Sequence, residues 1–267
     1  MSDSRRAQLN EWVNEQLSGL MQPDSSAIDL TTVSGDASFR RDFRAQLPGQ
    51  SFIAVDAPPE NENSELFVEI AGYFREAGVR APQVVATNFL DGFLLLEDFG
   101  DHLYLPRLLK LQEGGLDTIA QYQVENLYRE AIDALVRIQS GVDKKRLAPY
   151  SREKLREEMQ LFEDWFCKDY LQLDLSVNER ELIATTFDFL EEQMLGQKQL
   201  AVHRDYHSRN LLILDAARFS EGSGPGIIDF QDALAGSYSS AMVSLLRDFS
   251  TRWSPFSVAS LAGRMCV

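Results

Sequence analysis

Apolar residues recur at helical spacing in five stretches of the chain. In residues 4–20 the large apolar side chains fall on one face of a helix: Leu9, Trp12, Val13, Leu17 and Leu20. Residues 63–77 show the same spacing and are followed by Gly78, and glycine commonly terminates helices. The pattern predicts three more helices, at 120–140, 151–171 and 178–195.

Short segments rich in β-branched and aromatic residues predict strands. They cover residues 31–33, 38–45, 51–55, 83–87, 92–97, 211–214 and 226–228, with turn signals such as Pro48-Gly49 between them. This order predicts an α+β fold in two lobes. Residues 1–99 are expected to form a β-rich lobe with an N-terminal helix, and residues 100–267 a mainly helical lobe, joined near Glu97–Asp101.

Composition excludes several classes of protein. With 44% hydrophobic residues, the 267-residue chain can bury a core and is not expected to be disordered. Its 41 acidic and 26 basic residues give a net charge of −15, which argues against a nucleic-acid partner. The two cysteines, Cys167 and Cys266, lie too far apart for a metal-ligand motif and form no disulfide framework.

The chain also lacks the patterns of membrane and exported proteins. Its first residues, MSDSRRAQLNEW, have no apolar signal-peptide core, and its apolar runs are shorter than the roughly 20 residues of a membrane span. No pattern indicates an obligate protein partner. The sequence therefore predicts a soluble, cytoplasmic protein.

Two neighbouring segments, VHRDYHSRNLLIL (202–214) and IIDFQD (227–232), contain the candidate chemistry. A strand–loop–strand unit of this kind brings Asp205, Asn210 and Asp229 to one cleft. Phosphoryl transfer uses such a set, because one carboxylate orients the attacking hydroxyl while an amide and a second carboxylate hold Mg²⁺. A single Asp or Asn in a loop is usually a turn residue, but the joint pattern H-x-D-x-x-x-x-N with a following D-F favours the functional interpretation.

At these motifs the chain resembles the aminoglycoside phosphotransferase and choline kinase family, which is related to the protein kinases. Within that family it is most similar to bacterial kinases that phosphorylate the anomeric hydroxyl of N-acetylmuramate and N-acetylglucosamine. The segments that carry the resemblance are VSGDASFRRDFR (33–44), AVDAPPEN (54–61), LLLEDFGD (94–101), HRDYHSRNLL (203–212) and IDFQDALAG (228–236). The resemblance implies a bilobal, protein-kinase-like fold, ATP and Mg²⁺ as cofactors, and an amino sugar of cell-wall recycling as the acceptor.

The resemblance also implies individual roles. Asp205 is expected to be the catalytic base, and Asn210 and Asp229 the magnesium ligands. His207 and Arg209 lie between them in sequence, where they either contact the substrate or pack the loop.

Nucleotide binding is expected in the N-terminal lobe. A turn of small residues between the first two strands is expected to cover the phosphates: Ser34, Gly35, Asp36, Ala37 and Ser38. Glu97 and Asp98 are expected to form the connector whose backbone contacts the adenine edge.

One position departs from the family pattern. Kinases of this superfamily use a lysine of the third strand to hold the nucleotide phosphates. This chain has no lysine before Lys110, so an arginine is expected to substitute, and Arg40, Arg41 and Arg44 are the nearby candidates. Arg41 and Arg44 suit a strand that faces the cleft, although side chains alternate and only one parity can point inward.

A second departure concerns activity. The resembling kinases carry Tyr-Asp, whose Asp braces the catalytic loop, where this chain has Ser240-Ala241, and they continue through further helices beyond Trp253. A loosened Asp205 is expected to slow catalysis. Two alternatives therefore stay open. One is a kinase for another small alcohol, such as choline or an aminoglycoside, and the other is a catalytically weak nucleotide-binding protein.

Overall fold

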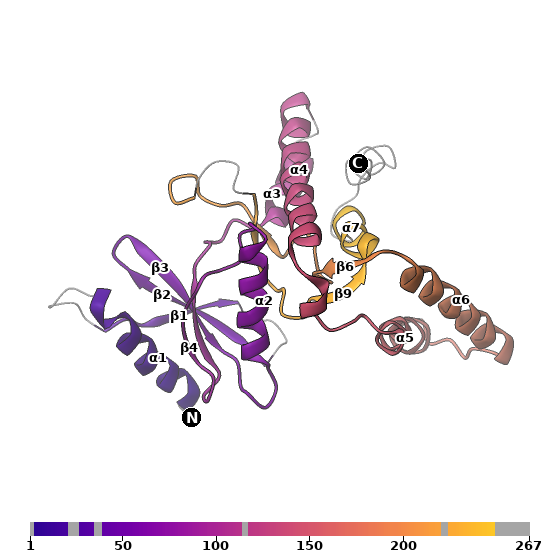
Figure 1. Cartoon of the computed structure of the whole chain (residues 1–267), viewed down its shortest axis with the longest axis horizontal. Helices are drawn as coiled ribbons and strands as arrows, with labels where there is room; N and C mark the ends of the chain where they lie inside the picture. Colours follow the sequence, from indigo (N-terminus) through magenta and orange to yellow (C-terminus); the bar gives the residue numbers. More distant parts are fainter. Residues whose placement is uncertain (1–2, 21–26, 35–38, 114–116, 220–223, 249–267) are drawn as a thin grey trace. The chain divides into compact units, whose positions relative to one another are not determined.

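The computed structural model describes residues 3–20, 27–34, 39–113, 117–219 and 224–248 (Figure 1). Its elements, in chain order, are α1 (Ser4–Leu17), η1 (Ser18–Leu20), β1 (Leu30–Ser34), β2 (Arg41–Leu47), β3 (Gln50–Asp56), α2 (Ser64–Glu76), β4 (Val84–Asn88), β5 (Phe93–Glu97), α3 (Tyr104–Glu113), α4 (Thr118–Gly141), η2 (Lys144–Arg146), α5 (Arg152–Leu161), η3 (Phe162–Tyr170), α6 (Val177–Gly196), β6 (Gln199–Val202), β7 (Leu211–Leu212), β8 (Gly226–Ile227), β9 (Leu234–Ser237) and α7 (Tyr238–Leu246).

Five of these strands form one antiparallel sheet in the order β1-β2-β3-β5-β4, built from the predicted strand segments. The hairpin between β2 and β3 turns at Gly49, whose φ of +80° is a conformation that glycine adopts without a steric penalty. Strand β2 begins at Arg41, three residues later than predicted. Its alternation buries Phe43, Ala45 and Leu47 on one face of the sheet, so Asp42 and Arg44 project from the other.

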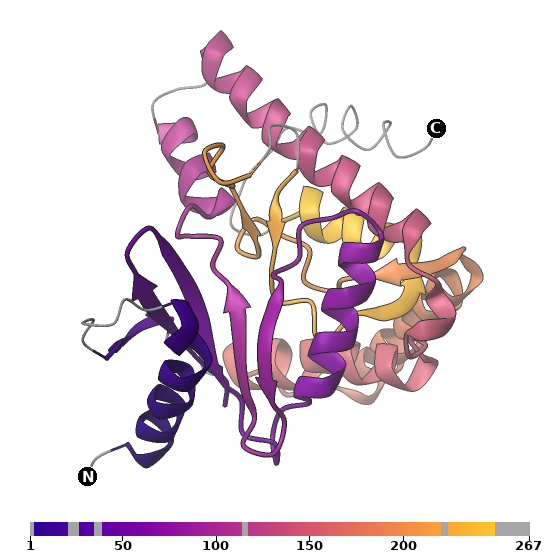
Figure 2. The same ribbon diagram turned by 60° about the vertical axis from the view of Figure 1, so that its left-hand side comes forward.

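Helices α1 and α2 lie on opposite sides of this sheet (Figures 1 and 2). The predicted apolar face of α1 is confirmed for Leu9, Val13 and Leu17, which are buried in one cluster with Phe43 and other sheet residues. Leu20 is 55% exposed, because α1 ends before it and the chain turns through η1. Helix α1 therefore covers the face of the sheet toward which Phe43 points.

The helical segments differ from the prediction in detail. The predicted helix 151–171 is α5 followed by the π-helix η3, in which the rings of Phe162, Phe166 and Tyr170 stack in succession. Helix α6 begins with a capping box between Ser176 and Glu179. The sequence pattern did not indicate helix α3, or the strands β6 and β9, which have only four residues each.

The chain divides into two compact units. One comprises Met1–Ala131 and Ser208–Gln231, and the other comprises Ile132–His207 and Asp232–Val267. Helix α4 contributes residues to both units. The two units are defined by which residues contact one another and are not the predicted lobes. The lobe boundary at residue 100 therefore stays a prediction.

Parts of two predictions lie outside the described residues. They are Gly35–Ser38 of the predicted phosphate-covering turn, and the segment 249–267 with Cys266. Within the described ranges, none of the helices is both long enough and apolar enough to cross a membrane.

Candidate functional site

Buried and exposed side chains alternate along the loop that follows β6. His203 and Tyr206 are fully buried and meet edge to face, with ring centroids 5.6 Å apart. Burial raises the pKa of the Tyr206 phenol, so this anchor stays neutral. Asp205 and Arg209 are exposed. The anchors thus hold the loop while Asp205 remains accessible to a substrate.

Contacts to both the side chain and the backbone hold Arg204 in place. Its guanidinium lies 2.5 Å from a Glu158 carboxylate oxygen and 3.4 Å from one of Asp232. Its backbone φ is +75°, an unfavourable value for a residue with a Cβ, and the Ser244 hydroxyl of α7 donates to its carbonyl oxygen at 3.2 Å. These contacts hold the strained backbone immediately before Asp205.

Asn210 and Asp229 are brought together by the two-stranded sheet of β7 and β8. Leu211 pairs with Ile227, and the Ile228 N–H donates to the Asn210 carbonyl at 3.1 Å. The Asn210 amide nitrogen then lies 3.0 Å from Asp229 Oδ2. Asp229 itself is exposed and has φ +62°, so the backbone turns sharply where β8 has ended.

The donor set of this pair fits a magnesium ion. Gln231 donates to the other Asp229 oxygen at 2.9 Å, so both carboxylate oxygens accept from amides. A half-turn of the Asn210 amide places its oxygen beside Asp229, and Mg²⁺ needs few protein oxygens because it retains waters. Over the described part of the chain there is no cluster of three or more His, Cys, Asp or Glu side chains suited to a metal.

Phe230, the residue after Asp229, is fully buried against α2. Its ring stacks on Phe67 with centroids 4.9 Å apart and contacts Phe74 at 5.4 Å. The guanidinium of Arg40 lies over the Phe67 ring, at 4.9 Å from its centroid. One continuous set of contacts therefore leads from Asp229 to the residue that precedes β2.

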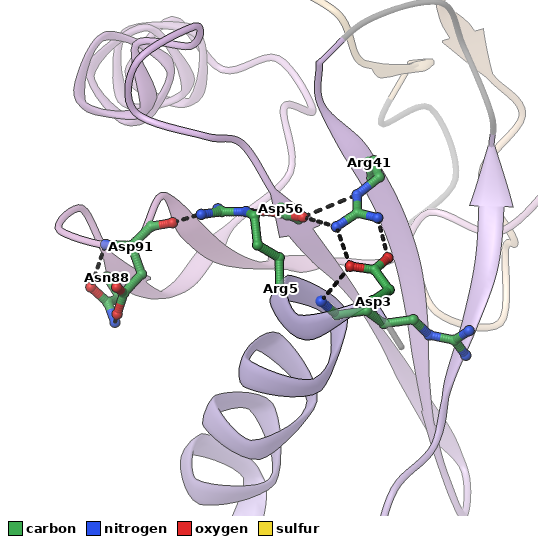
Figure 3. Close-up of polar contacts among 7 residues, drawn as sticks. Asp3, Arg5, Arg41, Asp56, Asn88 and Asp91 are labelled. Carbon is green, nitrogen blue, oxygen red and sulfur yellow. Dashed lines mark hydrogen bonds and ion pairs between the residues drawn. The ribbon is translucent and has the colours of Figure 1, made fainter. Parts of the chain in front are cut away.

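Arg41 points to the face of the sheet that α1 covers (Figure 3). Its Nε lies 3.0 Å from Asp56, whose side chain is fully buried, and its guanidinium also pairs with Asp3. Arg5 of α1 donates to the second Asp56 oxygen at 2.5 Å and to the Asp91 carbonyl at 2.7 Å. Arg41 thus belongs to a network that joins α1, β2 and β3.

Arg44 points to the same face as Asp42 and contacts the connector after β5. Its guanidinium lies 2.7 Å from Asp98 and 2.8 Å from Asp101, and these carboxylates raise its pKa. Burial raises the pKa of Asp98, but hydrogen bonds from Arg44, Ser51 and the Gly100 N–H outweigh it, and the net pKa lies below the ordinary value.

The remaining predicted residues lie at identifiable places. Ser34 is the last residue of β1 and pairs with Asp42 across the sheet. The Glu97 N–H at the end of β5 donates to the Gln83 carbonyl at 2.8 Å. His207 is half-buried, and its backbone N–H donates to the Asp205 carbonyl at 3.0 Å.

The residues that hold the candidate groups in place were not predicted from the sequence. Asp56, Glu158, Asp232 and Ser244 each fix an arginine or its backbone. Two signals were available: Asp56 ends an apolar strand, and Asp232 lies within the IIDFQD segment. Glu158 and Ser244 lie on helices with no local motif.

Comparisons with known proteins give the family of the chain. The profile of the phosphotransferase enzyme family matches residues 29–264. The N-acetylmuramate/N-acetylglucosamine kinase of Pseudomonas aeruginosa is 34% identical over 256 residues, which cover 94% of this chain and 70% of that protein. The kinase of the same name from Neisseria meningitidis is 36% identical over 226 residues, covering 84% of this chain and 63% of that protein.

Among solved structures, the choline kinase LicA from Streptococcus pneumoniae is similar with a TM-score of 0.63 and 11% identity, over 96% of this chain and 79% of that one. Another structure of LicA is a complex with AMP. At this identity the likeness shows the fold alone, and it confirms the predicted protein-kinase-like α+β class.

Proposed function

This chain belongs to the phosphotransferase enzyme family, and we propose that it transfers the γ-phosphoryl group of ATP to the anomeric hydroxyl of N-acetylmuramate and N-acetylglucosamine. The observation that carries the proposal is 34% identity, over 94% of the chain, to a kinase named for these two sugars. The chain is accordingly a phosphotransferase with an alcohol acceptor. We place the reaction in cell-wall sugar recycling in the cytoplasm, where ATP is available.

Asp205 is the proposed catalytic base. In the reaction the anomeric oxygen forms a bond to the γ-phosphorus, the bond from that phosphorus to the bridging oxygen breaks, and ADP leaves. Asp205 accepts the hydroxyl proton, and its exposure on a firmly anchored loop supports this role. His207 and Arg209 are the proposed substrate contacts on the same loop.

Asn210 and Asp229 are the proposed ligands of Mg²⁺. When bound, the ion neutralises charge on the nucleotide phosphates. Their separation of 3.0 Å and their oxygen donors support the assignment. Asp229 is exposed although the next residue, Phe230, is fully buried, so its carboxylate is accessible to an ion.

The N-terminal sheet is the proposed nucleotide site. Backbone N–H groups of Ser34–Ser38 are proposed to approach the phosphates, and the backbone around Glu97 and Asp98 the adenine edge. An arginine from the Arg40–Arg44 segment supplies the positive charge that the absent lysine would provide. The AMP complex of the structurally similar choline kinase supports a nucleotide in this fold.

A phosphate-transfer panel tests the proposal. The purified chain, with Mg-ATP, is offered N-acetylmuramate, N-acetylglucosamine, choline and an aminoglycoside, and ³¹P NMR locates the phosphate on the product. We expect product with the two amino sugars only, phosphorylated at the anomeric oxygen.

Two other outcomes contradict the proposal in different ways. Faster turnover of choline or an aminoglycoside would assign a different acceptor within the same family. Thermal stabilisation by Mg-ATP without turnover of any acceptor would indicate a nucleotide-binding protein. Ala241 bears on that second case, because it is fully buried where the resembling kinases carry the bracing aspartate.

A further inference from the structure

The three arginines of the Arg40–Arg44 segment differ in what each must release in order to bind phosphate. An arginine that leaves a buried carboxylate strands an uncompensated charge, whereas one that leaves a partly exposed carboxylate lets water replace it. The exposure of each partner therefore ranks the three candidates.

Arg41 is committed to a structural partner. The Asp56 side chain is 0% exposed and receives Arg41 and Arg5 together (Figure 3). Arg41 also lies on the α1 face of the sheet, whereas Asp42 and Arg44 point to the other face. Releasing Asp56 would be costly, and the guanidinium would face the wrong side of the sheet for a ligand shared with Asp229.

Arg44 faces the other side of the sheet, but it is also committed. Its partner Asp98 is 2% exposed and depends on Arg44 for two hydrogen bonds, at 2.7 and 3.2 Å. Arg44 thus stabilises the connector after β5.

Arg40 differs from both. Its carboxylate partner, Asp42, is 29% exposed and lies two residues away, at 2.9 Å from Nε and 3.3 Å from Nη2. A guanidinium edge that donates to both oxygens of a carboxylate can donate to two phosphate oxygens in the same way. Asp42 stays in contact with water when phosphate takes its place on the guanidinium.

The position of Arg40 also connects it to the magnesium end of the site. Its guanidinium lies over Phe67, and Phe67 stacks on Phe230, which directly follows Asp229. The ring restricts the freedom of the guanidinium, so less entropy is lost when phosphate binds.

Resting on the proposed function, we propose that Arg40 is the nucleotide-binding residue that replaces the missing third-strand lysine, and that Phe67 positions it. Arg41 and Arg44 are structural residues that fix α1 and the connector. Arg40 thus binds the nucleotide phosphates from the position immediately before β2, the strand that neighbours β3 in the sheet.

Calorimetric binding without acceptor sugar tests this assignment. In Arg40→Gln we expect Mg-ATP affinity to fall about 10- to 100-fold, while adenosine affinity stays within about twofold, because only the phosphates are contacted. Arg40→Lys should recover part of the loss, since it keeps the charge but not the paired contact. Phe67→Leu should weaken Mg-ATP binding less than Arg40→Gln does.

Arg218→Gln is the matched control, because Arg218 also lies over a phenylalanine ring, at 5.4 Å from the Phe219 centroid, and belongs to the same unit. It should leave both affinities unchanged. Unchanged Mg-ATP affinity in Arg40→Gln, or an equal loss for adenosine, would overturn the proposal, and loss confined to Arg44→Gln would assign the role to Arg44. Normal Arg40-dependent ATP binding without sugar phosphorylation would refute the proposed acceptor and leave the assignment standing.

Discussion

The loop 203–210 and the segment Arg40–Arg44 present their charged groups by different means. In the loop, the buried side chains of His203 and Tyr206 lie on either side of Asp205 in the sequence and leave it exposed. In the arginine segment, partners between 15 and 57 positions away decide which guanidinium is committed to structure. A motif therefore identifies the reacting groups of the loop, whereas only the fold separates one arginine from the next.

The largest effect should come from the loop. Asp205→Asn keeps the size of the side chain but removes the proton acceptor, so we expect kcat to fall about 10²- to 10⁴-fold with Mg-ATP affinity unchanged. Steady-state kinetics and calorimetry measure the two quantities separately. Asp174→Asn, a change at a fully exposed carboxylate on the same unit, is the control.

The next effect should come from Arg41. Arg41→Gln removes charged hydrogen bonds to the buried Asp56, so the free energy of unfolding should fall by about 1.5–3 kcal/mol. Urea denaturation monitored by circular dichroism gives the value. If this variant were as stable as the wild type but bound Mg-ATP poorly, Arg41 and not Arg40 would be the nucleotide-binding residue.

Ser244→Ala probes the brace on the loop. The change removes the hydrogen bond to the Arg204 carbonyl, which is worth about 1 kcal/mol and corresponds to about a fivefold change in rate. We expect kcat to fall by about that factor with little change in KM for ATP. An unchanged kcat would show that α7 does not position Asp205 through this contact.

The smallest effect concerns pH and the connector. Folding lowers the pKa of Asp98, so its stabilising contribution is complete above the ordinary value of 3.8 and is lost as the pH falls through the lower folded value. The difference in free energy of unfolding between wild type and Asp98→Asn should stay constant between about pH 7 and pH 5 and shrink below that range. Denaturant titrations at several pH values test this, and a difference that changes near neutrality would contradict it.

The sequence predicted the parts of the molecule whose cause is local. The apolar face of α1, the five strands of the main sheet and the pairing of Asn210 with Asp229 follow from periodicity, turn residues and a short motif. Alternation alone does not determine which face of β2 points toward the nucleotide, because it does not say which face α1 covers.

Long-range and irregular features could not be predicted in this way. The break from α5 into the π-helix η3 leaves the hydrophobic spacing of residues 151–171 almost unchanged, so periodicity predicts one helix. The role of Ser244 depends on the carbonyl of a residue 40 positions earlier. The pairing of Asp56 with Arg5 spans 51 positions, and no local pattern indicates that these two residues meet.

The burial of Asp56 determines what a substitution of this residue by lysine would do. A lysine at this position would place three cations side by side, with Arg5 and Arg41 on either side and no carboxylate between them. Asp56 is the cross-strand partner of Arg41, so a lysine there would also lie on the α1 face of the sheet, away from the side on which Arg44 projects. A single exchange of Asp56 for lysine would therefore weaken the anchoring of α1 without supplying a cation to the nucleotide.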